Sequence, residues 1–136
     1  MKRISLALVT GLMSLTAAVA AQLDPDPEKP VQHRVVPDVT TLEEATTVFV
    51  DTTAQLQAKT SLDAEELHEI HMITYSLEKA LAYFVEHSDG AMKATAEEMA
   101  IVVERVHLGS ENNRVDETKT SLDEYFQLAE AFSTAL

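Results

Sequence analysis

The sequence predicts an all-α domain, an up-down-up-down antiparallel four-helix bundle that follows a signal peptide and a proline-rich leader. Three observations predict it. All four prolines lie before residue 40, so the rest of the chain lacks the residue that most strongly interrupts helices. Beyond that point apolar residues recur at alternating spacings of three and four, which is typical of packed helices and not of strands. The segments are joined by short loops, and short loops make neighbouring helices antiparallel.

Residues 1–20 have the composition of a cleavable secretory signal peptide. A positive start at Lys2 and Arg3 precedes an apolar run, and Ala18-Val19-Ala20 supplies the small residues before the cleavage point. A retained membrane anchor is the alternative, but the apolar run is shorter than the roughly 20 residues that a span needs. We therefore expect cleavage near Ala20, a bacterial periplasmic or secreted protein, and no membrane insertion of the mature chain.

The composition of the mature chain limits the classes of partner that it is expected to bind. Loss of Lys2 and Arg3 from ten basic residues leaves eight against 23 acidic ones, a net charge of −15. Such a surface argues against nucleic acid and favours cations or basic proteins, although it also serves solubility alone. The chain has no cysteine, which excludes thiolate metal sites, cysteine nucleophiles and covalent attachment of haem.

Residues 21–39 form a polar leader that contains all four prolines and is expected to be extended and flexible. Within it, the apolar pair Val35-Val36 is the segment that would dock onto the domain. The bundle itself is assigned to residues 40–136.

Helices are expected at about 42–59, 63–88, 91–110 and 114–134. Thr41 and Glu44 form a capping box at the start of the first. Its centre is rich in β-branched residues, which weakens this helix, so a three-helix arrangement with a displaced first helix is the main alternative.

The second helix begins at Asp63, with Glu66 three residues later and with Leu62 and Leu67 placed as a hydrophobic staple. Gly90 is the expected stop between the second and third helices, and the fourth starts near Asn112-Asn113. The expected core faces, in chain order, are Leu42, Ala45, Phe49, Thr52 and Leu56; Leu67, Ile70, Thr74, Leu77, Leu81 and Phe84; Met92, Ala96, Met99, Val103 and Val106; and Val115, Thr118, Leu122, Tyr125, Ala129 and Phe132.

Histidines provide the main candidates for chemistry. On the helix 63–88, His68, His71, Tyr75 and Glu78 follow one side at spacings of three, four and three. His33 in the leader and His87 at a helix end are interpreted as solvated.

Folding the next helix back at residues 89–90 brings other polar residues to the same heights along the bundle. His107 then lies opposite His71, and Glu104 opposite Tyr75. Two imidazoles and a carboxylate are suitable ligands for zinc, copper or iron. The alternative is a structural histidine pair whose polar atoms are satisfied by Tyr75 and Glu104.

Haem and enzymatic chemistry are less well supported. The sequence has no C-x-x-C-H motif. Bundles that bind b-type haem use a methionine of the first helix and a histidine of the fourth as axial ligands. Here the expected first helix has no methionine and the expected fourth helix has no histidine. Glycine occurs only at positions 11, 90 and 109, which leaves no phosphate loop, dinucleotide fingerprint or G-x-S-x-G motif. No catalytic residue is assigned, and no cofactor beyond a divalent metal is expected.

Two stretches, L-H-E-I-H-M-I-T-Y-S-L-E-K-A-L at 67–81 and E-R-V-H-L-G-S-E at 104–111, resemble a family of small secreted bacterial helical proteins catalogued as a domain of unknown function. The resemblance implies a signal peptide, a polar leader and a helical bundle over residues 40–136, with no known activity. Gly109 stands where the family has another small residue, and this is expected to loosen the end of the third helix. The residues that the resemblance marks are His71, Thr74, Tyr75, Glu78, His107, Ser110 and Glu111.

The sequence thus favours an exported, acidic, non-enzymatic bundle with a binding or envelope-associated role. The alternative is a cation-binding bundle that uses His71 and His107. The first-rank cluster is His71, Tyr75, Glu78, Glu104 and His107, and the second-rank residues are His68, Ser110 and Glu111.

Overall fold

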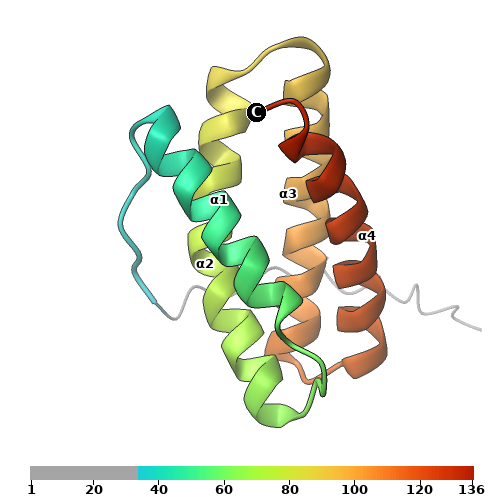
Figure 1. Cartoon of the computed structure of the whole chain (residues 1–136). Helices are drawn as coiled ribbons and strands as arrows, with labels where there is room; N and C mark the ends of the chain where they lie inside the picture. Colours follow the sequence, from blue (N-terminus) through green and yellow to red (C-terminus); the bar gives the residue numbers. More distant parts are fainter. Residues whose placement is uncertain (1–33) are drawn as a thin grey trace, which may run out of the picture.

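The computed structural model describes residues 34–136, which form four helices and contain no strand. The helices are α1 (Leu42–Gln57), α2 (Ala64–His87), α3 (Gly90–Glu111) and α4 (Val115–Ser133). Each packs antiparallel against the next in the chain (Figure 1). The predicted four-helix bundle is confirmed, and each helix end lies within two residues of its predicted position.

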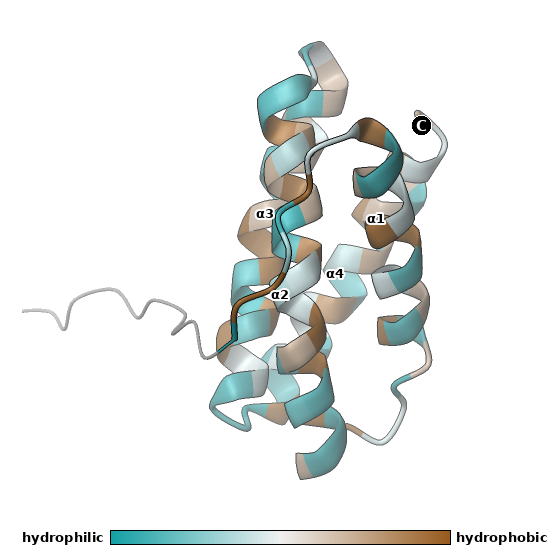
Figure 2. Ribbon diagram, turned by 90° about the vertical axis from the view of Figure 1, so that its left-hand side faces the viewer, coloured by the Kyte–Doolittle hydropathy of each residue, from teal (hydrophilic) through white to brown (hydrophobic). Residues whose placement is uncertain are grey.

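The predicted signal peptide and most of the leader fall outside the described residues. The described part of the leader runs along α2 before α1 begins (Figure 2), where Asp38 forms an ion pair with Lys79 at 2.7 Å. Val36 is buried at 7% exposure, whereas Val35 is 90% exposed, so only one residue of the predicted pair docks. None of the described helices is long and apolar enough to cross a membrane.

Aromatic side chains close the bundle by joining α1 to α4. The ring of Phe49 on α1 lies edge-on to Phe84 of α2 at 6.2 Å and to Phe132 of α4 at 5.4 Å between centroids, an arrangement that aromatic rings prefer. Tyr125 of α4 shares a hydrogen bond of 2.6 Å with Thr53 of α1, and burial raises the pKa of its phenol. The first helix is therefore part of the core, which excludes the alternative with a displaced first helix.

The predicted core faces are buried except at helix starts. Leu42 is 58% exposed and Val115 is 44% exposed, and each is the first residue of its helix. Met92, in the first turn of α3, is only partly buried. All three side chains lie in the first turn of their helices, where the predicted face is not fully covered by the neighbouring helices.

Side chains at the starts of α1 and α2 cap these helices and hydrogen-bond to the loop residues before them. The predicted capping box of Thr41 and Glu44 is present, and Asp63 caps α2 by accepting from the amides of Glu65 and Glu66. Glu66 does more than a capping residue: its Oε2 accepts from three successive backbone amides, those of Thr60, Ser61 and Leu62, at 2.8–2.9 Å. These bonds hold Leu62 at a positive φ of 49°, a conformation that L-residues rarely adopt.

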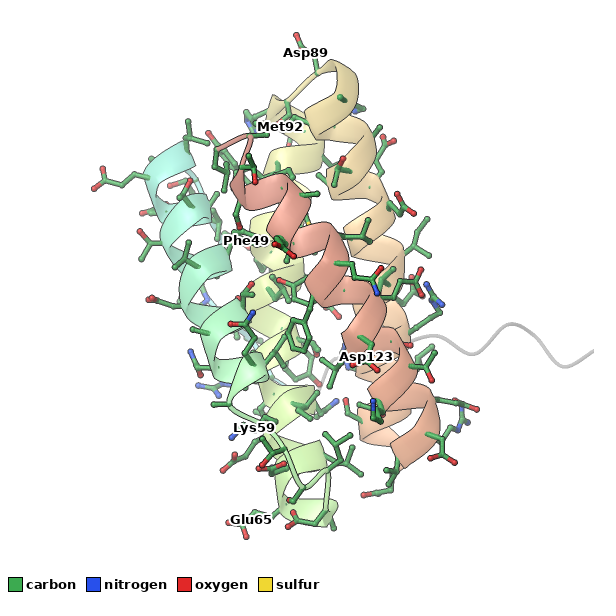
Figure 3. All side chains as sticks on the ribbon, turned by 45° about the vertical axis from the view of Figure 1, so that its right-hand side comes forward. Phe49, Lys59, Glu65, Asp89, Met92 and Asp123 are labelled. Atoms are coloured by element: carbon green, nitrogen blue, oxygen red, sulfur yellow. The ribbon has the colours of Figure 1, made fainter. Side chains whose placement is uncertain are left out.

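We predict that Glu66 makes stability depend on acid pH. The amides of residues 60–62 lower the pKa of its carboxyl below the ordinary 4.5. A lowered folded pKa gives a contribution that is complete above pH 4.5 and is lost as pH falls through the folded pKa. Glu66→Gln should lower the urea midpoint at pH 7 and flatten its decline between pH 5 and 3. Glu65→Gln, which removes an exposed charge in the same turn at the bundle end seen in Figure 3, is the matched control; equal profiles for the two variants would contradict the prediction.

Gly109 does not loosen the end of α3, contrary to expectation. The helix continues to Glu111 and ends in a Schellman motif, in which Arg114 N donates to Gly109 O at 2.8 Å and Asn113 N to Ser110 O at 3.2 Å. Asn113 occupies the left-handed position with φ 54°. A Cβ on Gly109 would meet Thr118 Oγ1 at 2.6 Å, so the missing side chain lets α4 approach α3 closely.

Gly109→Ala should therefore destabilise the bundle although alanine favours helices. The gain in helix propensity of about 1 kcal/mol is opposed by overpacking against Thr118, which costs typically 1–3 kcal/mol. We expect a net loss on the order of 1 kcal/mol, or a Tm lower by roughly 4–8 °C. Thr118→Ala in the Gly109→Ala background should recover part of the loss, and a higher Tm for Gly109→Ala alone would disprove the close-packing argument.

Candidate metal centre

Two histidines meet in the interior, between α2 and α3. The ring centroids of His71 and His107 lie 4.7 Å apart with their planes at 74°. His71 is 5% exposed and His107 1% exposed. The approach predicted from their equal heights is present, and it lies in the half of the bundle where α2 begins and α3 ends (Figure 1).

Each imidazole has an outer hydrogen-bond partner on α2. His107 Nδ1 lies 2.6 Å from Glu78 Oε1, and His71 Nε2 lies 3.1 Å from the hydroxyl of Tyr75. An ionised carboxylate only accepts, so the His107 Nδ1–H donates to Glu78 and the lone pair of a neutral ring is left on Nε2. Histidines that ligate a metal almost always donate their other ring N–H to an outer partner of this kind.

The Nε2 atom of His107 is the most informative atom of the site. It is buried and has no hydrogen-bond partner within residues 34–136. Leaving a buried polar atom unsatisfied costs about 1–3 kcal/mol. The hydrogen bond to Glu78 therefore satisfies only one of the two ring nitrogens of His107. The other nitrogen, Nε2, is buried and has a lone pair available.

Glu111 joins the two histidines in a group whose atoms are placed to hold a metal ion. One atom each from His71, His107 and Glu111 lies within 4.8 Å of the others. Tetrahedral ligands at about 2.1 Å from an ion are about 3.4 Å apart, so binding requires these atoms to approach one another by at most about 1.4 Å. Glu111 is only half-buried, in the last turn of α3, and a change of its rotamer can supply much of this movement.

Two hydroxyls fix the backbone beneath the histidines. Thr74 Oγ1 donates to the carbonyl of His71 at 2.7 Å, and Ser110 Oγ donates to the carbonyls of Val106 and His107 at 2.7 and 3.0 Å. Both hydroxyl residues are buried and both follow a histidine by three positions. They satisfy polar groups at the core and are positioned as supports of the histidines, not as ligands.

The remaining candidates lie further out. Glu104 is exposed and is not part of the group formed by His71, His107 and Glu111. His68 is exposed, with its ring centroid 6.4 Å from that of His71. It borders a pocket of about 480 Å³ whose lining is Ala64, His68, His71, Met72, Ser110, Glu111 and Asn113.

Comparison with known proteins places this chain in a family. A family model described as a family of unknown function (DUF6746) matches residues 1–134. The chain belongs to this family. The DUF6746 match agrees with the resemblance to a family of unknown function, and it extends over nearly the whole chain and not only residues 40–136. No curated protein and no solved structure matched the sequence.

In this DUF6746 member the carboxylates beside the histidines are Glu78 and Glu111, which do not lie at equal heights with them along the bundle. Cα–Cβ bonds tilt toward the N-terminus of their helix, so on antiparallel helices the side chains of Glu78 and His107 lean toward each other. Glu111 leans back toward His107, from which it is separated by one helical turn. The spacing of four between His107 and Glu111 indicates that both lie on one helix face. For identifying a neighbour of His107, this spacing is a better guide than equal height along the bundle.

Proposed function

We propose that this protein is an exported, non-enzymatic binding protein whose bundle binds one divalent transition-metal ion through His71, His107 and Glu111. The observation that carries the proposal is the buried Nε2 of His107, which has no hydrogen-bond partner within the described part of the chain. A metal ion would turn this unsatisfied lone pair into a ligand bond.

The donor set favours a borderline metal. Two imidazoles and a carboxylate are suited to zinc, copper and iron, whereas calcium and magnesium prefer oxygen ligands throughout. A purely structural histidine pair would be satisfied by Glu78 and Tyr75, but it would leave His107 Nε2 desolvated. The direct contact of the two rings, at 4.7 Å between centroids, leaves no room for a porphyrin between them.

A docking role is less well supported by the described surface. The large apolar side chains exposed there come from the leader, from α1, α3 and α4 and from the C-terminal end, whereas His71, His107 and Glu111 converge within 4.8 Å of one another. The exposed apolar residues are Val35, Leu42, Val50, Ile101, Val115 and Leu136.

Zinc should stabilise the bundle. Zinc at about one hundred times its Kd would add about 2.7 kcal/mol to the free energy of unfolding, which raises the Tm of a domain of this size by roughly 10 °C or more. His71→Ala and Glu111→Gln should abolish most of the gain. Scanning calorimetry of each protein with and without zinc or copper is the test.

Two further variants sharpen that experiment. His87→Ala removes an exposed histidine at the far end of α2 and should leave the gain unchanged. Glu78→Gln should weaken metal binding by about 10- to 100-fold without abolishing it, as loss of an outer partner does. Equal melting of the wild type with and without zinc and copper would rule out the proposal.

The proposal that the protein is exported depends on its N-terminal residues. Lys2 and Arg3, the apolar run and Ala18-Val19-Ala20 support removal of about 20 residues by signal peptidase. Expression of the full chain in a bacterium, followed by fractionation and intact-mass measurement, should give a periplasmic or secreted protein that begins near Ala21. Ala18→Leu with Ala20→Leu should block cleavage; a full-length cytoplasmic product from the natural sequence would contradict export.

A further inference from the structure

We infer that His68 is the fourth ligand of the ion held by His71, His107 and Glu111, and that it closes the site against solvent. The inference rests on the proposed function and deepens it, because it decides between two kinds of metal site. A site with three protein ligands keeps a position for an external ligand, whereas a site with four does not.

The position of His68 on α2 permits this role. It precedes His71 by three residues, and residues three apart lie on one face of a helix. Their ring centroids are 6.4 Å apart, with 35° between the planes. Imidazoles that share one tetrahedral ion have centroids roughly 5 Å apart, so His68 must approach by about 1–1.5 Å. Because its side chain is exposed, a rotamer change can supply this movement without disturbing the core.

The surface pocket provides the space in which the ligands meet. His68, His71 and Glu111 all line the cavity of about 480 Å³ at this end of the bundle. The histidines become progressively less accessible, from the exposed His68 through His71 at 5% to His107 at 1% exposure. An ion from solvent thus meets His68 first and the deepest ligand, His107, last.

Three imidazoles and one carboxylate would complete a tetrahedron. The outer position, which otherwise holds water, is then occupied by His68, and the ion cannot take up an external ligand. Such a centre sequesters a metal and does not activate a substrate, which accords with a binding role.

Cobalt(II) tests this assignment, because its visible absorption reports the ligands and the geometry around the ion. The full mature chain is titrated with cobalt(II), and azide is then added as a small external ligand. The wild type should bind cobalt with a spectrum that azide leaves unchanged. His68→Ala should bind with a Kd higher by about 10-fold or more, at least the effect of losing an outer partner, and azide should shift its spectrum. His87→Ala is the matched control and should behave as the wild type.

The outcomes separate the two claims. If His68→Ala binds cobalt as tightly as the wild type, or if azide shifts both spectra alike, His68 is not a ligand, although the site of His71, His107 and Glu111 stands. If the wild type binds neither cobalt nor zinc, the proposed function and this inference both fail. Far-UV circular dichroism of His68→Ala is the folding control, and it should match the wild type because the substituted side chain is exposed.

Discussion

The packing of α2 against α3 is the constraint on which the rest of this structure depends. These are the two longest of the helices within residues 34–136, and their shared face carries polar residues as well as the apolar core. His71, Thr74 and Tyr75 on α2 and His107 and Ser110 on α3 are all buried. Burying such groups is favourable only if they are hydrogen-bonded. One of these bonds, from His107 to Glu78, crosses from α3 to α2 and helps to fix the relative position of the two helices beside the apolar contacts.

Those partners are supplied almost entirely within the same pair of helices. Glu78 orients His107, Tyr75 bonds to His71, and Thr74 and Ser110 bond to backbone carbonyls one turn earlier. The Schellman motif at residues 109–114 then lets α3 run as far as Glu111 before the chain turns. The result places a carboxylate, two buried imidazoles and an exposed third imidazole at one end of the bundle, in a cysteine-free chain that carries a net charge of −13. That charge attracts cations toward the surface, while the imidazoles select among them.

Sequence periodicity predicted the fold well because each helix buries one continuous face. The capping residues Thr41 and Asp63 were identifiable because their effect is local and depends only on residues within four positions. The prediction was less accurate where the environment of a residue depends on the ends of other helices, as for Leu42 and Val115. Gly109 was misread because its role, the close approach of Thr118, involves a residue on the next helix.

The sequence by itself determined the four helices, their antiparallel order and the pairing of His71 with His107, because periodicity and short loops leave few ways to bury four apolar faces. Only the tertiary structure decided which carboxylates join the histidines. Counting residues along antiparallel helices locates Cα atoms, whereas contacts are made by side chains that tilt in opposite directions on the two helices. That tilt brings Glu78 to His107 and leaves Glu104 in solvent. The burial of His107 Nε2, which directs attention to a metal, likewise arises only when α2 and α3 close over it.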